Sequence, residues 1–264
     1  MQAVRPRPAS NGMRRAFAIA LNTFREAIRD RVLAGILGFA ILYILVVIFL
    51  GALSLGDLMM IRSFGLAVVY VFGLLATIFL GSSILYKEIE RRTLYFVLAK
   101  PVTRGEVVVG KFLGMFAAVA LSVGIMAAIY LAVVAYEGGG MDLWGLLAIG
   151  FELMELGVFI ALLICLSAIV SPMTSTVCAI LVLFTGHLLG TALEQAKTVS
   201  GAAYTVIQVL YTVLPNLEKF NIRDLVVHQV ALTPTVVVAA VAYGGIYIAA
   251  LLYVGWLLFR RREL

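Results

Sequence analysis

Six long apolar runs constrain the fold of this chain more than any other feature of its sequence. Each run is long enough to cross a lipid bilayer, which takes about 20 mostly apolar residues. The runs cover residues 32–53, 64–86, 112–135, 146–170, 173–195 and 235–259. Because backbone groups cannot remain unpaired in hydrocarbon, each run should be a helix. The sequence shows none of the alternating ten-residue segments that a membrane β-barrel needs.

The composition excludes a soluble domain, because 63% of the residues are hydrophobic and only 13% are charged. No stretch outside the six runs is large enough to bury a core of its own. The sequence therefore predicts an all-α integral membrane protein. In this prediction residues 1–264 form a single domain with six transmembrane helices.

Basic residues are distributed unevenly between the two ends of these runs. Seven Arg precede the first run, six Lys and Arg lie in residues 87–111, and three Arg follow the last run at 260–262. Together they make 7 + 6 + 3 = 16 of the 20 basic residues. Under the positive-inside rule, both termini and residues 87–111 are cytoplasmic, which requires an even number of spans. The net charge of +6 then reflects topology and anionic lipids, and no nucleic-acid partner is expected.

The residues before the first run divide into two parts. Residues 1–12 are predicted to be a disordered leader, and residues 13–31 have an amphipathic pattern. The apolar face of this pattern comprises Phe17, Ala20, Leu21, Phe24 and Ile28. The charged candidates are Arg25, Glu26 and Arg29. The pattern predicts an interfacial helix on the cytoplasmic leaflet, in contact with membrane lipids, and a flexible basic leader is the alternative.

A charged segment separates the second run from the third. Residues 88–99 have helical spacing, with Ile89 and Phe96 on one stripe, and Pro101 follows them. Glu88 can pair with the arginines three and four positions later. The pattern predicts a short cytoplasmic helix, and a solvated charged loop is the alternative.

A helix-start signal follows this segment directly. Thr103 and Glu106 have the spacing of a capping box, in which the threonine caps the helix and the glutamate bonds back to it. A helix from Arg104 to about residue 135 would be about 48 Å long, which is more than a bilayer requires. Its first turns are therefore predicted to project into the cytoplasm.

The same residues contain an apparent nucleotide-binding motif. Residues 105–112 read GEVVVGKF and differ from a phosphate-binding loop at Phe112, where a hydroxyl should bind Mg²⁺. Three consecutive valines are unsuited to a loop whose backbone must wrap phosphates, and the capping box places them in a helix. We interpret Gly110 and Gly114 as small residues that allow close helix packing.

Proline also marks the starts of the last two runs. Ser171 precedes Pro172 and Thr233 precedes Pro234, which is typical of a cap followed by the first helical position. Residues 196–233 between these runs are predicted to be external. Their apolar part is too short to span, so we expect one or two short helices that re-enter or cap the outer surface.

These motifs carry a family resemblance. The segment LAKPVTRGEVVVGKF, placed between a charged helix and a span, resembles the first cytoplasmic loop of ABC-2-type transporter permeases, the six-helix membrane subunits of exporters. The external LPNLEKFNIRDLV (Leu214–Val226) is similar to the segment before the last span in one subgroup. That subgroup includes the permease of nitrous-oxide reductase and multicopper enzyme maturation systems. The resemblance covers essentially the whole chain.

The resemblance implies a function and a set of partners. Residues 88–99 would be a coupling helix that docks on a separate ATPase subunit, which would bind ATP and Mg, while this chain would bind no cofactor. Two ATPases and two permeases, identical or related, would form the transporter in a prokaryotic inner membrane. The first and fifth spans would lie near the permease–permease interface, where Gly186 and Gly190 permit close approach. The implied coupling residues are Glu88, Glu90, Arg91, Arg92, Leu94, Phe96, Pro101 and Arg104. The residues that characterise the external segment are Leu214, Pro215, Asn216, Phe220, Arg223 and Asp224.

Polar residues inside the spans are further candidates, because burying charge in a membrane is costly. Glu152 and Glu155 are three positions apart in the fourth run and share a face, while His187 and Glu194 lie in the outer half of the fifth run. Together they would form a cation or proton site, or a substrate exit, near an external cavity. The alternative is that the two carboxylates mark an interfacial start of the fourth helix.

The sequence shows no ligand-like grouping for a metal and no nucleophile with an adjacent base, so we expect neither a metal site nor an enzyme. The preferred hypothesis is the permease subunit of an ATP-driven exporter. An ion-coupled secondary transporter that uses the intramembrane Glu and His residues is the alternative, although the paired broken helices of such transporters are absent from the sequence. A third hypothesis is a membrane anchor that passes mechanical work to an external accessory protein through residues 196–233. The sequence does not specify the substrate.

Overall fold

The structure is a computed structural model that describes residues 10–53, 58–90, 103–196, 201–228, 230 and 232–261. The described residues are overwhelmingly helical and contain no strand, which confirms the predicted all-α class. The long helices are α1 (Ser10–Ile28), α2 (Arg31–Leu53), α3 (Leu58–Glu90), α5 (Arg104–Val134), α6 (Leu143–Ser167), α7 (Pro172–Ala196) and α10 (Pro234–Arg261). The shorter elements are a π-helical turn (Ala135–Gly139), α8 (Ala202–Val213), a 3₁₀ turn (Leu217–Phe220) and α9 (Arg223–Val227).

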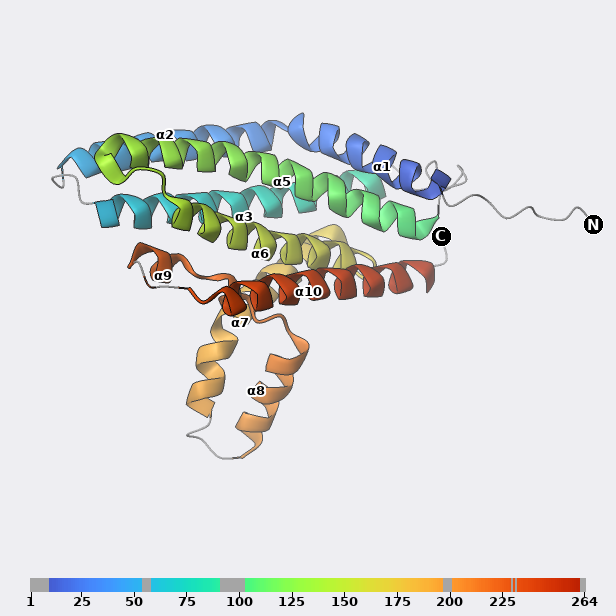
Figure 1. Cartoon of the computed structure of the whole chain (residues 1–264). Helices are drawn as coiled ribbons and strands as arrows, with labels where there is room; N and C mark the ends of the chain where they lie inside the picture. The colour runs from blue at the N-terminus through green and yellow to red at the C-terminus, as the bar shows by residue number, and fades with distance from the viewer. Residues whose placement is uncertain are drawn as a thin grey trace, which may run out of the picture.

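Helices α2, α3, α5, α6 and α10 run side by side and form the main bundle (Figure 1). The start of α1 and the end of α10 lie at one end of this bundle, which we call the proximal end; the opposite end is the distal end. Five helices of the described chain are long and apolar enough to cross a membrane: Leu58–Gly81, Arg104–Gly139, Leu143–Ser167, Met173–Ala196 and Pro234–Arg260. Helix α2 has 23 residues, and its described apolar part, Leu33–Val46, is shorter than a span.

Helix α6 lies at the centre of the bundle and packs against α3, α5, α7 and α10. Its sequence is apolar on every side, which is the pattern of a helix buried all round. Phe159, Ile160 and Leu163 are among the largest fully buried side chains. The start of α6 is exposed at Leu143, Trp144 and Leu146, so it is further along the helix that a polar side chain contacts protein.

Helix α1 packs along the first half of α5 through glycines. A Cβ on Gly110 would lie 2.8 Å from the Ala16 carbonyl oxygen, and a Cβ on Gly114 would lie 2.5 Å from that of Ala20. Each step of four residues on α5 is matched by a step of four on α1, so the two helices run in the same direction in register. The predicted close packing at Gly110 and Gly114 is thus confirmed.

This contact shows which face of residues 13–31 packs against protein. The face of α1 that packs on α5 is made of the small residues Ala20, Thr23 and Ala27, which are buried. Phe17 is 66% exposed and Leu21 also stays exposed, because a close helix pair has no room for large side chains. The charged candidates are exposed or half-buried: Arg25, Glu26 and Arg29. The structure thus gives α1 a packing partner, because α1 follows α5 (Figure 1), and its position on the membrane surface stays a prediction.

The start of α5 has the predicted capping box. The Glu106 backbone N–H donates to Thr103 Oγ1 at 3.3 Å, and the Thr103 N–H donates to a Glu106 carboxylate oxygen at 2.9 Å. The GEVVVGKF residues are accordingly helical and do not form a phosphate-binding loop. Before this cap, α3 extends through Glu90. The remaining residues of the predicted coupling helix, 91–99, and Pro101 lie outside the described part of the chain, as do the side chains of Glu88 and Glu90.

Helices α7 and α8 lie side by side and project from the main bundle as a hairpin (Figure 1). Helix α7 begins at Pro172, and Ser171 Oγ accepts a hydrogen bond from the Thr174 N–H at 3.4 Å, as the sequence predicted. One face of α7 exposes large apolar side chains: Met173, Val177, Leu181, Phe184 and Leu188.

Candidate functional site

A group of polar side chains from three helices meets in the distal half of the bundle. The Tyr70 hydroxyl on α3 donates to Glu155 Oε1 on α6 at 2.8 Å and lies 3.0 Å from His187 Nε2 on α7. The same His187 nitrogen is 2.9 Å from Glu155 Oε1. Three residues that are far apart in the sequence thus form a closed triangle inside an apolar bundle.

The segment that follows α8 completes this network. Glu218 Oε2 is 3.1 Å from His187 Nδ1, so both ring nitrogens of the histidine face carboxylates. The Glu218 Oε1 atom accepts from the Asn221 side-chain amide at 3.1 Å, and the Asn221 oxygen accepts from Arg223 Nε at 3.1 Å. Arg223 Nε lies 3.8 Å from Glu152 Oε1, and its guanidinium covers the Tyr70 ring at 4.2 Å.

The two carboxylates of α6 are deeply buried. Glu152 is 2% exposed and Glu155 is 1% exposed, about two and three turns inside a helix that begins at Leu143. The alternative that they mark an interfacial start of this helix was therefore wrong. The Glu152 oxygens accept no hydrogen bond from the described residues, so the charge of Arg223 is the nearest compensation they have.

The predicted outer group of four is only partly assembled. Glu152, Glu155 and His187 come together, whereas Glu194 is exposed and lies two turns further along α7. Sequence reasoning missed Tyr70, which is one of 11 tyrosines and has no distinguishing local pattern. It also missed Glu218 and Asn221, which lie inside the quoted LPNLEKFNIRDLV motif but were not singled out.

We call residues 214–227 the plug segment, because they fold back against the helices instead of remaining on the surface. Leu217 and Phe220 are fully buried. A Cβ on Gly186 of α7 would lie 2.7 Å from the Pro215 carbonyl oxygen, and one on Gly244 of α10 would lie 3.1 Å from the Phe220 ring. These two glycines therefore provide the space in which the segment packs.

Helix α10 holds the first part of the plug segment by polar contacts. The Asn216 N–H donates to the Tyr243 hydroxyl at 2.8 Å, and the Lys219 ammonium lies 4.2 Å from the centre of the Tyr243 ring. The Asn216 side-chain amide donates to Tyr211 of α8 at 3.2 Å. Residues 216–219 of the plug segment are thus held both by α10 and, through Glu218, by the Glu–His network. The remaining external candidates have no such role: Leu214 ends α8, and Asp224 is exposed.

A second charged cluster joins α3 to the turn before α6. Tyr130 donates to Asp142 Oδ2 at 2.7 Å, and Arg62 Nε lies 3.4 Å from the same oxygen. The other Asp142 oxygen caps α6 by accepting from the Gly145 N–H at 3.0 Å. No local pattern in the sequence pairs Arg62 with Asp142.

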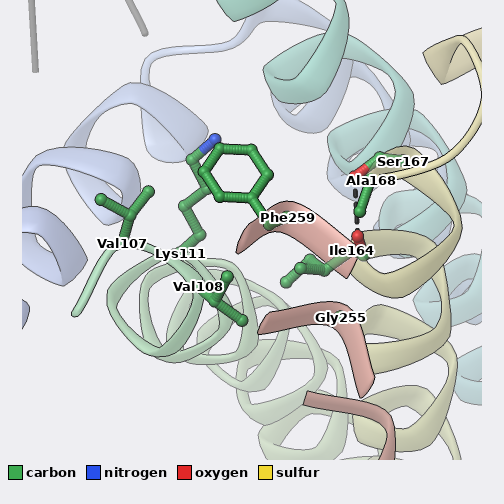
Figure 2. A pocket seen from close by; sticks show the side chains of 8 residues that line it. All are labelled: Val107, Val108, Lys111, Ile164, Ser167, Ala168, Gly255 and Phe259. Carbon is green, nitrogen blue, oxygen red and sulfur yellow. Dashed lines mark hydrogen bonds between the residues drawn. The ribbon is translucent and has the colours of Figure 1, made fainter. Parts of the chain in front are cut away.

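At the proximal end, Arg104 contacts α10. Its guanidinium donates to the carbonyl oxygens of Phe259 at 2.6 Å and Arg260 at 2.9 Å, which are orphan acceptors at the end of a helix. Beside this contact lies a cavity of about 30 Å³ between α5, α6 and α10 (Figure 2). Its lining residues are Val107, Val108, Lys111, Ile164, Ser167, Ala168, Gly255 and Phe259. This volume accommodates water but no organic substrate.

The described residues contain no group of three His, Cys, Asp or Glu side chains arranged for a metal ion. The buried charges pair with one another across helices instead, as intramembrane charges generally do. The interactions in this site are therefore hydrogen bonds and ion pairs between the plug segment and the helices.

Long apolar helices with paired charges inside them define a polytopic membrane protein. Over residues 17–264 the chain matches the family model described as ABC-2 family transporter protein. The chain therefore belongs to the ABC-2 transporter family and is a membrane transport component, not itself a catalytic subunit. No curated protein matches it.

Proposed function

We propose that this chain is the permease subunit of an ATP-driven exporter, with six crossings and both termini in the cytoplasm of a prokaryotic cell. In this topology α2 supplies the crossing that precedes the five long apolar helices, and the proximal end of the bundle is cytoplasmic. The observation that carries the proposal is the family match over residues 17–264. The concentration of basic residues before α2, around residues 87–111 and after α10 supports the orientation.

The proximal end provides a route for force from an ATPase. Residues 91–102 connect α3 to α5, and the capping box fixes the first turn of α5 immediately after them. Arg104 joins this turn to the end of α10, and Gly110 and Gly114 join α5 to α1. A displacement of residues 91–102 would therefore act on α1, α5 and α10 together.

This geometry gives Arg104 a different role from that of the other coupling candidates. Its guanidinium is bonded to the α10 carbonyls of its own chain, so we assign it a positioning role. We assign direct contact with the ATPase to the candidate residues that precede Arg104 in the chain. These are Glu88, Glu90, Arg91, Arg92, Leu94, Phe96 and Pro101.

A second permease copy is the proposed partner of α7. The exposed stripe that begins at Met173 and ends at Leu188 has the spacing of a helix-packing seam. Gly186 is occupied by the plug segment of its own chain, whereas no described atom lies within 4 Å of a Cβ on Gly190. Of the two predicted interface glycines, Gly190 is therefore the one with open space beside it, although it lies on the opposite side of α7 from the exposed stripe.

Ion-coupled transport remains a second candidate because the Glu155–His187 pair is buried inside the bundle. It predicts flux that follows a proton or sodium gradient without ATP and that loses this dependence in a Glu152→Gln, Glu155→Gln double variant. Gradient-independent flux would exclude it.

Copurification tests the ATP-driven proposal. The permease is solubilised from native membranes in a mild detergent, and the nucleotide-binding subunit that copurifies is measured by its ATPase activity. Charge reversal at Arg91 and Arg92 should abolish copurification, while reversal at the exposed Arg14 of α1 should preserve it. If the unmodified permease recovers no ATPase subunit, the proposal is wrong.

A further inference from the structure

We propose that His187 and its two carboxylates form a proton-operated latch that holds the plug segment against the bundle. In this latch the protonated imidazole bridges Glu155 of α6 to Glu218 of the plug segment. Loss of the proton weakens the hold on the plug segment.

Two carboxylate oxygens face the two ring nitrogens of one histidine, at 2.9 Å for Glu155 and 3.1 Å for Glu218. Ionised carboxylates only accept hydrogen bonds, so the ring can bond to each of them only through an N–H. A neutral imidazole has one N–H, and the imidazolium has two. Both contacts are therefore hydrogen bonds when His187 is protonated.

Tyr70 shows how the neutral ring would be accommodated. Its hydroxyl lies within hydrogen-bond distance of both Glu155 Oε1 and His187 Nε2, so it can donate to either one. In each neutral tautomer, however, one carboxylate faces a nitrogen lone pair at about 3 Å. Deprotonation therefore breaks one of the two bridges whichever tautomer forms.

Burial decides which of the two bridges breaks. Glu155 is 1% exposed, whereas the Glu218 side chain is 48% exposed and can be hydrated where it lies. A ring lone pair that faced the buried Glu155 oxygen would be a repulsion that water cannot relieve, whereas water can solvate Glu218 where it lies. The neutral ring accordingly keeps its N–H on Glu155, and Glu218 loses its hydrogen bond to His187.

The other charges around His187 set the background for this step. The titratable and charged groups that face it come from α3, α6, the 3₁₀ turn and α9: Tyr70, Glu152, Glu155, Glu218 and Arg223. Arg223 partly balances Glu152, which leaves the two bridged carboxylates to the imidazolium. The contacts of Tyr243 with Asn216 and Lys219 do not involve His187, so deprotonation removes one of several contacts that hold these residues.

The latch should respond in opposite directions to two conservative substitutions. In His187→Gln a side-chain amide replaces two diverging N–H donors, so the plug segment should be loosened at every pH. In Glu155→Gln the new amide can donate to the neutral ring while Nδ1–H still reaches Glu218. The plug segment of that variant should stay docked at alkaline pH. A residue with a merely structural role would not give this reversal.

Distance measurements between two spin labels test the latch in the purified full-length permease in lipid nanodiscs. The labels are attached at the exposed Leu225→Cys in α9 and Val254→Cys in α10, with Cys165 and Cys178 replaced by alanine. Spectra are compared at about pH 5.5 and about pH 8.5, which lie on either side of the ordinary histidine transition. The ratio of undocked to docked segment should rise about tenfold on going to the higher pH, as expected for one lost charge-assisted hydrogen bond.

The second histidine of the chain supplies the matched control. His228 bonds to the Asp224 carbonyl outside the network, so His228→Gln should retain the full pH response. If the labelled protein with His187, Glu155 and Glu218 intact has the same distance distribution at both pH values, the proposal is overturned. It is also overturned if His228→Gln loses the pH response and His187→Gln keeps it. A role for the latch in gating rests on the proposed exporter function. The labels report docking without an ATPase, so the two proposals can fail separately.

Discussion

Replacing Gly114 by alanine provides a direct test of the α1–α5 contact. The added Cβ would lie 2.5 Å from the Ala20 carbonyl oxygen and 2.6 Å from Thr23 Cβ. Ordinary van der Waals contact begins at 3.4 Å, so α1 must retreat locally by most of an ångström. The obstacle is partly backbone, which cannot rotate away as a flexible side chain can.

The expected cost follows from this displacement. Overpacking a tight contact costs about 1–3 kcal/mol, while the exchange of glycine for alanine inside a helix gains up to about 1 kcal/mol. Gly124 of the same helix is exposed and has no described atom within 4 Å of its Cβ, so Gly124→Ala should show the gain alone. The difference between the two variants should therefore be about 1–3 kcal/mol, with Gly114→Ala the less stable.

The assay is thermal unfolding of each purified variant in lipid nanodiscs. For a chain of this size 1 kcal/mol corresponds to a shift of about 2–4 °C, so the two midpoints should differ by several degrees. Equal midpoints, or a higher midpoint for Gly114→Ala, would show that α1 does not pack on α5 through the glycines.

Three other substitutions test separate parts of the structure. Gly186→Val should displace the plug segment and raise its hydrogen exchange, whereas Gly190→Val should leave that exchange unchanged; equal exchange in the two variants would contradict the packing. Asp142→Ala leaves Arg62 without its carboxylate and should lower unfolding stability by on the order of 3 kcal/mol, and a loss below about 0.5 kcal/mol in a denaturation series would refute the ion pair. Arg104→Ala removes two helix-end hydrogen bonds and should increase hydrogen exchange in the last turn of α10, while unchanged exchange there would exclude the positioning role.

The helices themselves could be predicted because their signals are local. Long apolar runs, the capping box at Thr103 and the proline at position 172 act within a few residues, and the structure contains the elements they indicate. The role of Gly110 and Gly114 was also predictable, because small residues four apart share one helix face. Their partner helix was not, since any apolar helix with small residues could have supplied it.

Amphipathicity does not identify the face of α1 that packs on α5, for a physical reason. In a soluble helix the largest apolar side chains face the core, but in a lipid environment they gain nothing by leaving the surrounding hydrocarbon. Close packing decides the contact face instead, which favours Ala20 and Ala27 over Phe17. Hydrophobic pattern alone cannot distinguish a lipid-facing stripe from a protein-facing one.

The sequence by itself therefore determined the class of protein and the positions of its long helices, because bilayer thickness and backbone pairing act on local composition. Its charge placement predicts their orientation. Only the tertiary structure decided which polar groups meet. Glu155, His187 and Glu218 are 32 and 31 positions apart, and Arg104 contacts a carbonyl 155 positions away. Such pairings depend on how helices rotate and where the plug segment folds back, and no local pattern encodes either of these.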